Sequence, residues 1–272
     1  MTGYTYPDKN DVMTSQLIGE VSRNDYWGKS ERLVLERAEE FIRKSAQAEG
    51  SGCKAEGVVV GSALDLGCGQ GRLLPWLAAL ASEVTGAEPD PERMKAAAVL
   101  AEGLKTAAGQ PVSVLCGDVS EAEKHIAPES LDLALSSHVI QHIPMAVTGD
   151  MFMRLGRLMK KGGILVMTAT ISPGAEDAYT LESMKDGVRS SERSDRAGFE
   201  AAADMPGVLP VAFYTQNTVK GFMEPAGFDL ADVWGYHFDV PGRFAGISDD
   251  RAFNEAGDLS FARDVMYIFV RR

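Results

Sequence analysis

The sequence contains few cysteines and few histidines. Its 272 residues include 3 cysteines, Cys53, Cys68 and Cys116, which lie far apart and form no C-x-x-C pair. An odd number of dispersed cysteines argues against a disulfide framework or a zinc site and is typical of a reducing compartment. The 4 histidines are not spaced with carboxylates in the way metal ligands are, so we expect no metal centre.

Excess positive charge and long apolar runs are also absent. Lys and Arg number 27 against 39 Asp and Glu, which gives a formal net charge of −12 without any cluster of basic residues. This balance argues against a nucleic-acid partner. No apolar run approaches membrane-spanning length, and Met1–Asn10 lacks the core of a signal peptide. We therefore expect a cytoplasmic protein without a membrane partner, while the sequence leaves open whether it forms a homo-oligomer.

The most informative segment that is present is Val58–Leu77, VVVGSALDLGCGQGRLLPWL. It begins with apolar residues of strand length, ends in a run compatible with a helix, and places Gly67, Gly69 and Gly71 between them. Glycines adopt positive φ readily and, without a Cβ, allow a ligand to lie against the backbone. The start of the following helix offers unpaired N–H groups. The segment predicts a nucleotide-binding strand, turn and helix.

The rest of the chain alternates between strand and helix patterns. Further strands are predicted at Glu83–Glu88, Pro111–Cys116, Leu131–Ser137, Ile164–Thr170, Phe228–Tyr236 and Val265–Val270. Helices are predicted at Ser30–Ala48, Glu92–Leu104, Gly149–Lys160 and Thr218–Ala226. Repeated alternation with short turns indicates an α/β fold with a doubly wound, mostly parallel sheet of the Rossmann-like kind.

Four motifs in order resemble those of the class I S-adenosylmethionine (SAM) dependent methyltransferases. Asp65–Gly71 reads as E/D-x-G-x-G-x-G after an apolar strand, and GAEPDPERM follows the second strand like the second motif. Gly117-Asp118 resembles the third motif, and Ser137-His138 stands where the fourth begins. The resemblance covers about 57–170 and, more weakly, the C-terminal third. It implies seven strands with the last one antiparallel, an N-terminal helical extension or lid over 1–56, and a SAM-binding domain over 57–272 with an insertion at 172–209.

The resemblance also implies which residues bind SAM. A carboxylate such as Glu88, at the end of the second strand, can accept both ribose hydroxyls. Asp118 would accept the exocyclic amine of adenine, and Asp65 would lie near the methionine end. The full set implied is Asp65, Gly67, Cys68, Gly69, Gly71, Glu88, Pro89, Gly117, Asp118, Val119, Ser137 and His138.

The predicted activity is transfer of the SAM methyl group to a small-molecule acceptor by in-line displacement, which depends mainly on orientation. A protonated acceptor would need a base, and histidine suits neutral pH. His138 and His237 are the catalytic candidates. Tyr26, Trp27, Tyr214 and Trp234 are candidates for a lid or acceptor pocket, with a place in the core as the alternative. The insertion at 172–209 is expected to be a substrate lid, or otherwise a solvated surface excursion.

Two other functions stay open. The chain could be a SAM-binding protein that transfers no methyl group, including a regulatory one, because binding motifs are visible in the sequence whereas catalytic groups are not. An NAD(P)-dependent oxidoreductase is disfavoured, because the glycines read G-x-G-x-G instead of G-x-G-x-x-G. No N-P-P-Y sequence follows the fourth strand, where SSHV stands instead. This argues against methylation of amide nitrogens or base amines.

Overall fold

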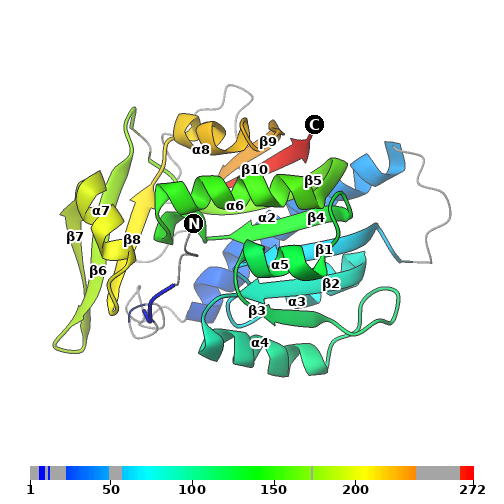
Figure 1. The fold of residues 1–272 in the computed structure, drawn as a ribbon, viewed down its shortest axis with the longest axis horizontal. Helices are drawn as coiled ribbons and strands as arrows, with labels where there is room; N and C mark the ends of the chain where they lie inside the picture. Colours follow the sequence, from blue (N-terminus) through cyan, green and yellow to red (C-terminus); the bar gives the residue numbers. More distant parts are fainter. Residues whose placement is uncertain (1–5, 10–11, 13–22, 49–56, 173, 237–263) are drawn as a thin grey trace.

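Seven strands form one sheet at the centre of the fold (Figure 1). They are β1 (Val60–Leu66), β2 (Ala81–Glu88), β3 (Ser113–Cys116), β4 (Leu131–Ser137), β5 (Met159–Thr170), β9 (Phe228–Tyr236) and β10 (Asp264–Arg271). The strand order is β3-β2-β1-β4-β5-β10-β9. The first five strands are parallel, and β10 is antiparallel to both of its neighbours. The predicted Rossmann-like fold with an antiparallel last strand is confirmed.

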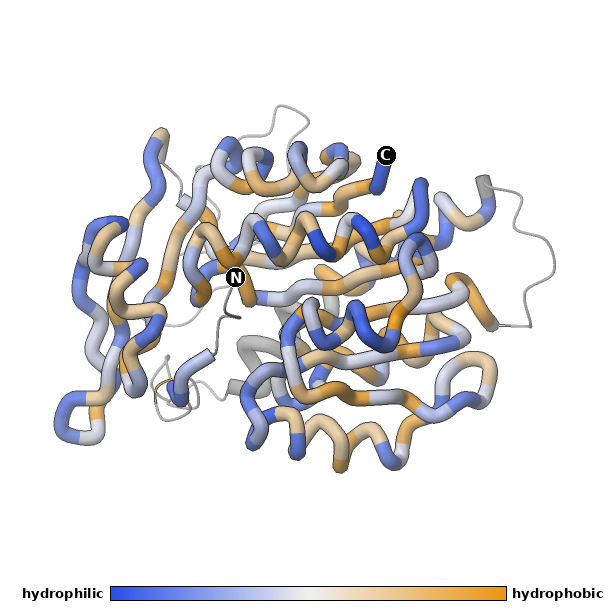
Figure 2. Tube along the Cα trace, in the orientation of Figure 1, coloured by the Kyte–Doolittle hydropathy of each residue, from blue (hydrophilic) through white to orange (hydrophobic). Residues whose placement is uncertain are grey.

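The computed structural model describes residues 6–9, 12, 23–48, 57–172, 174–236 and 264–272, and of 23–33 and 236 the backbone alone. Within these ranges, helices cover both faces of the sheet. One face carries α5 (Val119–His125), α6 (Met145–Leu158) and α8 (Gln216–Met223), and the other carries α2 (Arg23–Ala48), α3 (Leu74–Leu80) and α4 (Pro91–Glu102). Strand β5 supplies both layers, because Leu165 packs in one core cluster and Val166 in the other. Figure 2 shows the matching amphipathic pattern on α6, where hydrophobic and hydrophilic residues alternate.

The insertion after β5 forms a second, antiparallel sheet. Its strands are β6 (Ala178–Lys185), β7 (Val188–Ser194) and β8 (Val208–Phe213), in the order β7-β6-β8, and α7 (Arg196–Ala203) packs on them. Figure 1 shows this inserted sheet at one end of the molecule, beyond the carboxyl end of β5. The last inserted strand runs to Phe213, past the predicted limit of the insertion at Leu209.

A short N-terminal segment is attached to the inserted sheet. The Lys9 side chain is only 1% exposed, and its Nζ donates to the carbonyl oxygens of Ala202 at 3.0 Å, Met205 at 2.8 Å and Val208 at 2.6 Å. Val12 packs against Leu209 and Val211. The N-terminal segment and the insertion therefore share one small core.

Several element boundaries differ from those predicted. Helix α2 begins at Arg23 instead of Ser30, and α8 spans Gln216–Met223 instead of Thr218–Ala226. Helix α6 spans Met145–Leu158 instead of Gly149–Lys160, and β5 begins at Met159 instead of Ile164. The pairing of β4 with β5 is irregular near the start of β5, because its register shifts between Leu131, which faces Met159, and Leu133, which faces Ile164. None of the helices among the described residues has the length and hydrophobicity needed to cross a membrane.

Candidate active site

The Gly-rich turn between β1 and α3 has the backbone that its sequence predicts. Gly67, Gly69 and Gly71 have φ values of 76°, 59° and 84°. A Cβ on Gly67 would lie 2.5 Å from Val139 Cγ2, and one on Gly69 would lie 2.6 Å from Arg93 Nη2. The positive φ therefore favours glycine at both positions. At Gly67 the Val139 side chain also leaves no space for a Cβ, whereas at Gly69 the close atom is the end of the flexible Arg93 side chain.

Two buried carboxyl groups stand at the carboxyl ends of β1 and β2. Glu88 is 3% exposed, and its Oε2 accepts from the N–H of Gly69 at 2.8 Å while its Oε1 accepts from the N–H of Asp90 at 3.0 Å. Asp65 is 2% exposed, and its Oδ2 has no hydrogen-bond partner among the described residues. Burial, and then the nearby charge of Glu88, raise the pKa of Asp65 to about 7. A buried carboxyl oxygen without a partner is suited to a cationic donor.

A cavity of about 600 Å³ opens beside this turn at the carboxyl ends of the parallel strands. Four predicted cofactor residues from three motifs line it, namely Gly67, Pro89, Asp118 and Val119. Asp118 caps α5, because its Oδ1 accepts from the N–H of Ser120 at 2.8 Å and from its hydroxyl at 2.6 Å. Ligands of doubly wound folds bind at this edge of the sheet.

Hydrogen bonds connect the end of β4 with β5 and the inserted sheet. His138 follows β4 with a left-handed φ of 55°, and its N–H donates to the Thr168 carbonyl oxygen at 2.8 Å. Gln141, in the short helix η1 (Ile140–His142), lies with Nε2 3.1 Å from His138 Nδ1, and its Oε1 accepts from the N–H of Thr170 at 3.3 Å. His142 Nδ1 lies 2.8 Å from the Pro210 carbonyl oxygen. Burial lowers the pKa of His142 to about 3, which keeps its ring neutral.

Comparisons with known proteins relate part of this chain to methyltransferases. Residues 64–167 match the family model described as a methyltransferase domain. The chain is 26% identical over 185 residues to a ubiquinone biosynthesis O-methyltransferase of Azorhizobium caulinodans, across 65% of this chain and 62% of that protein. It is 28% identical over 199 residues to a ubiquinone biosynthesis O-methyltransferase of Methylobacterium nodulans, across 71% of this chain and 70% of that protein. Residues 64–167 of this chain therefore match a methyltransferase domain, in agreement with the four motifs that resemble those of the class I SAM-dependent methyltransferases.

The fold agrees with this assignment. A SAM-dependent methyltransferase of Methanosarcina mazei, 13% identical, superposes with a TM-score of 0.54 over 77% of this chain and 92% of that chain. At this identity the likeness concerns the fold alone. The chain spans 62% of the length of the Azorhizobium relative.

The structure places the other predicted site residues of the methyltransferase as follows. Cys68 is buried beside both carboxyl groups, and burial raises the pKa of its thiol, which keeps it protonated. Tyr214 is fully buried and Trp234 is 7% exposed, and both belong to core clusters, which was the alternative for these two aromatics. Tyr26 and Trp27 lie in the part of α2 whose side chains are not described. His237 lies outside the described residues.

Sequence reasoning missed part of the cavity of this methyltransferase. Tyr6 from the N-terminal segment and Asp204 from the insertion both line it, as do Val139 and Met151. No motif marks Tyr6 or Asp204, because only tertiary contacts bring their segments to the sheet. Gln141 could have been noticed, since it follows His138 at a spacing that brings two side chains together on a helical turn.

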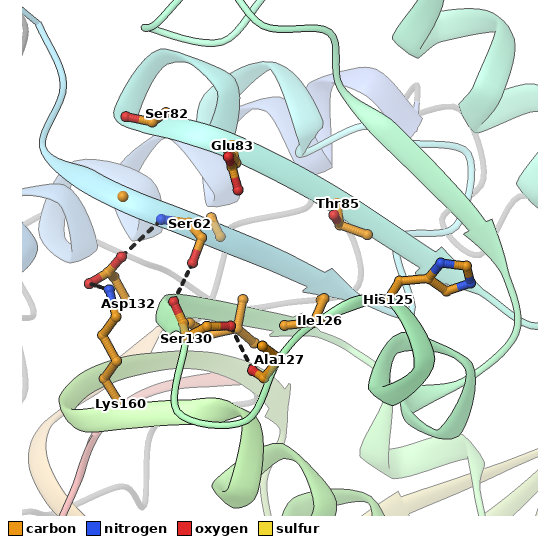
Figure 3. Close-up of a pocket in the computed structure, with 13 residues that line it drawn as sticks. Ser62, Ser82, Glu83, Thr85, His125, Ile126, Ala127, Ser130, Asp132 and Lys160 are labelled. Atoms are coloured by element: carbon orange, nitrogen blue, oxygen red, sulfur yellow. Dashed lines mark hydrogen bonds and ion pairs between the residues drawn. The ribbon is translucent and has the colours of Figure 1, made fainter.

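A second cavity, of about 520 Å³, lies at the opposite, amino-terminal edge of β1 and β4 (Figure 3). Its polar groups bind one another: Ser62 Oγ donates to the Ser130 carbonyl oxygen at 2.6 Å, and Lys160 Nζ donates to Asp132 Oδ1 at 2.7 Å. The other Asp132 oxygen, Oδ2, accepts from the N–H of Ser62 at 2.9 Å. This mutual pairing favours the carboxyl-end cavity as the cofactor site. Within the described residues, no three His, Cys, Asp or Glu side chains gather as a metal site.

Proposed function

We propose that this methyltransferase transfers a methyl group from SAM to an oxygen atom of a small-molecule acceptor. The observation that carries the proposal is the pair of buried carboxyl groups at the Gly-rich turn, Glu88 at the end of β2 and Asp65, whose Oδ2 has no partner in the part of the chain that the structure describes. SAM, when bound, supplies a methyl carbon attached to a sulfonium leaving group. The names of the two relatives favour oxygen as the acceptor atom.

The polar groups of the site fit the polar groups of SAM. Asp65 suits the ammonium group, since a cation restores a partner to its buried Oδ2. Each oxygen of Glu88 accepts one backbone N–H and has a second lone pair for a ribose hydroxyl. Asp118 uses Oδ1 for the cap of α5, which leaves Oδ2 for the adenine amine. Gly67 and Gly69 allow the ligand to approach the backbone.

The protein's own contribution to the reaction is orientation and exclusion of water. Apolar side chains of Val139, Ile143 and Met151 line the cavity. Tyr6 and Asp204 reach the same cavity from the N-terminal segment and the insertion, which supports our proposal that these two segments form a substrate lid. We further propose that the enzyme works in the cytoplasm. The absence of a nucleic-acid partner stays a prediction.

Calorimetric titration with SAM and with its demethylated product tests the proposal. Glu88→Ala should weaken binding at least tenfold, because it removes a charged acceptor of two ribose hydroxyls and frees the Gly69 and Asp90 N–H groups. Glu83→Ala is the matched control, because Glu83 is an exposed residue at the other end of the same strand. We expect Glu83→Ala to bind SAM within about twofold of the wild type.

Other outcomes of the titration separate the remaining functions. If NADH binds while neither SAM nor its product does, the chain is an oxidoreductase and the proposal fails. If SAM binds normally but no methyl group is transferred to any phenol, catechol or aliphatic alcohol tested with labelled SAM, the chain is a SAM-binding protein of another role.

A further inference from the structure

The side-chain amide of Gln141 lies between two groups whose hydrogen-bonding roles are fixed by chemistry. The Thr170 N–H can only donate, so it requires the amide oxygen of Gln141, which lies 3.3 Å away. That bond directs the amide nitrogen, which can only donate, to Nδ1 of His138 at 3.1 Å. Nδ1 of His138 must therefore be an acceptor.

A neutral imidazole carries one proton, so an accepting Nδ1 places that proton on Nε2. We infer that Gln141 is a positioning residue that holds His138 as the Nε2–H tautomer, a hydrogen-bond donor at the carboxyl end of β4 instead of a base. The role of His138 in methyl transfer rests on the proposed function. The tautomer of His138 does not depend on that function, and it can be measured without SAM.

The surroundings hold this arrangement in place. Gln141 is 4% exposed, so its amide is shielded from water that could replace either bond. The His138 backbone has a left-handed φ of 55°, and its N–H donates to the Thr168 carbonyl oxygen. This bond fixes the position of the backbone from which the His138 side chain extends. Thr170 in turn donates from Oγ1 to the Ala212 carbonyl oxygen at 2.8 Å. A chain of hydrogen bonds thus runs from the His138 ring to strand β8 of the inserted sheet.

The neighbouring His142 has the opposite tautomer for the same kind of reason. The Pro210 carbonyl oxygen can only accept, and it lies 2.8 Å from His142 Nδ1, so the proton of that ring is on Nδ1. The two rings therefore differ at Nε2: this atom carries a proton in His138 and a lone pair in His142. With its proton on Nε2, His138 can donate a hydrogen bond from that atom but cannot take up a proton there.

The test is a long-range ¹H–¹⁵N correlation spectrum of the histidine rings in the full-length, ¹⁵N-labelled protein. His138 and His142 are assigned by the loss of their signals in His138→Asn and His142→Asn. We expect a protonated Nε2 and an unprotonated Nδ1 for His138, and the reverse for His142, which serves as the internal control. A His138 ring protonated at Nδ1 in the wild type would overturn the inference.

Substitution of Gln141 tests whether this residue determines the tautomer of His138. Gln141→Glu keeps an acceptor for the Thr170 N–H but presents a second acceptor to His138, so the His138 proton should move to Nδ1. Gln110→Glu adds the same charge at an exposed turn and should leave both spectra unchanged. Gln141→Met, which lacks both bonds, should give His138 a mixture of tautomers and supplies the answer if Gln141→Glu does not fold. Unchanged His138 signals in a folded Gln141 variant would contradict the assignment, whereas failure to bind SAM would overturn only the proposed function.

Discussion

At the scale of single residues, we propose that Asp65 binds the ammonium group of SAM, and its burial lowers the free energy of unfolding of the empty protein at neutral and alkaline pH. Its pKa of about 7 lies above the ordinary value of 3.8, mainly because the carboxyl is buried and then because Glu88 is near. The folded protein therefore holds a proton that the unfolded chain releases between about pH 4 and pH 7. By linkage, the contribution of Asp65 to stability falls as pH rises through this range and is lowest above pH 7.

Asp65→Asn should consequently stabilise the empty protein at alkaline pH while it prevents SAM binding. The variant removes the ionisable group, so we expect a free energy of unfolding higher by roughly 1–4 kcal/mol at pH 8 and nearly unchanged at pH 4. Urea denaturation at both pH values measures the difference. Glu176→Gln, an exposed carboxyl, should change stability by less than about 0.5 kcal/mol at either pH. Equal effects of Asp65→Asn at pH 4 and pH 8 would contradict the elevated pKa.

Whether a site residue could be predicted from the sequence depends on its position relative to the strands of the main sheet. Gly67, Gly69 and Glu88 could be predicted because a buried strand fixes the position of the residues that directly follow it, and only glycine suits the turn. Tyr6 and Asp204 could not be predicted, because they reach the cavity through packing of segments distant in the chain. Their positions depend on tertiary contacts that no local pattern records.

At the scale of elements, α6 carries two glycines in different surroundings. A Cβ on Gly149 would have no neighbour within 4 Å, whereas one on Gly156 would collide with the Ala226 carbonyl oxygen. Gly149→Ala should therefore stabilise the protein by about 0.5–1 kcal/mol through helix propensity. Gly156→Ala should destabilise it by roughly 1–3 kcal/mol, because the end of α8 must move away from α6. Thermal and urea unfolding of the two variants compare them directly, and a neutral Gly156→Ala would show that this contact is loose.

The elements that escaped prediction lack a strong hydrophobic period. Helix α5, VSEAEKH, has only seven residues and two buried side chains, Val119 and Ala122. Strands β6 and β7 are largely polar, and β7 has no fully buried residue, so 172–209 resembled a loop in the sequence. The strands β4, β5 and β10 of the main sheet were predictable because they are buried on both faces and give continuous apolar runs.

At the scale of the whole molecule, Lys9 joins two distant parts of the chain. Its ammonium group donates to three carbonyl oxygens at the end of α7 and the start of β8, and the Gly207 N–H donates to the Asp8 carbonyl oxygen. Burial lowers the pKa of Lys9 to about 8, so the group is still mostly charged at pH 7. Because Tyr6 and Asp204 line one cavity, this attachment also fixes a wall of the candidate site.

Lys9→Met should loosen the inserted sheet without unfolding the central sheet. The variant leaves three carbonyl oxygens without their donor, so we expect a local loss of roughly 1–3 kcal/mol and faster hydrogen–deuterium exchange in α7 and β8. Exchange in β1, β4 and β5 should stay as in the wild type, since Lys9 makes none of its three bonds there. Lys185→Met is the matched control, because Lys185 is exposed and its ammonium group donates to Glu192 on the neighbouring strand. Uniformly faster exchange throughout the chain would show that the attachment supports the whole fold, and unchanged exchange in α7 would show that Lys9 does not hold the insertion.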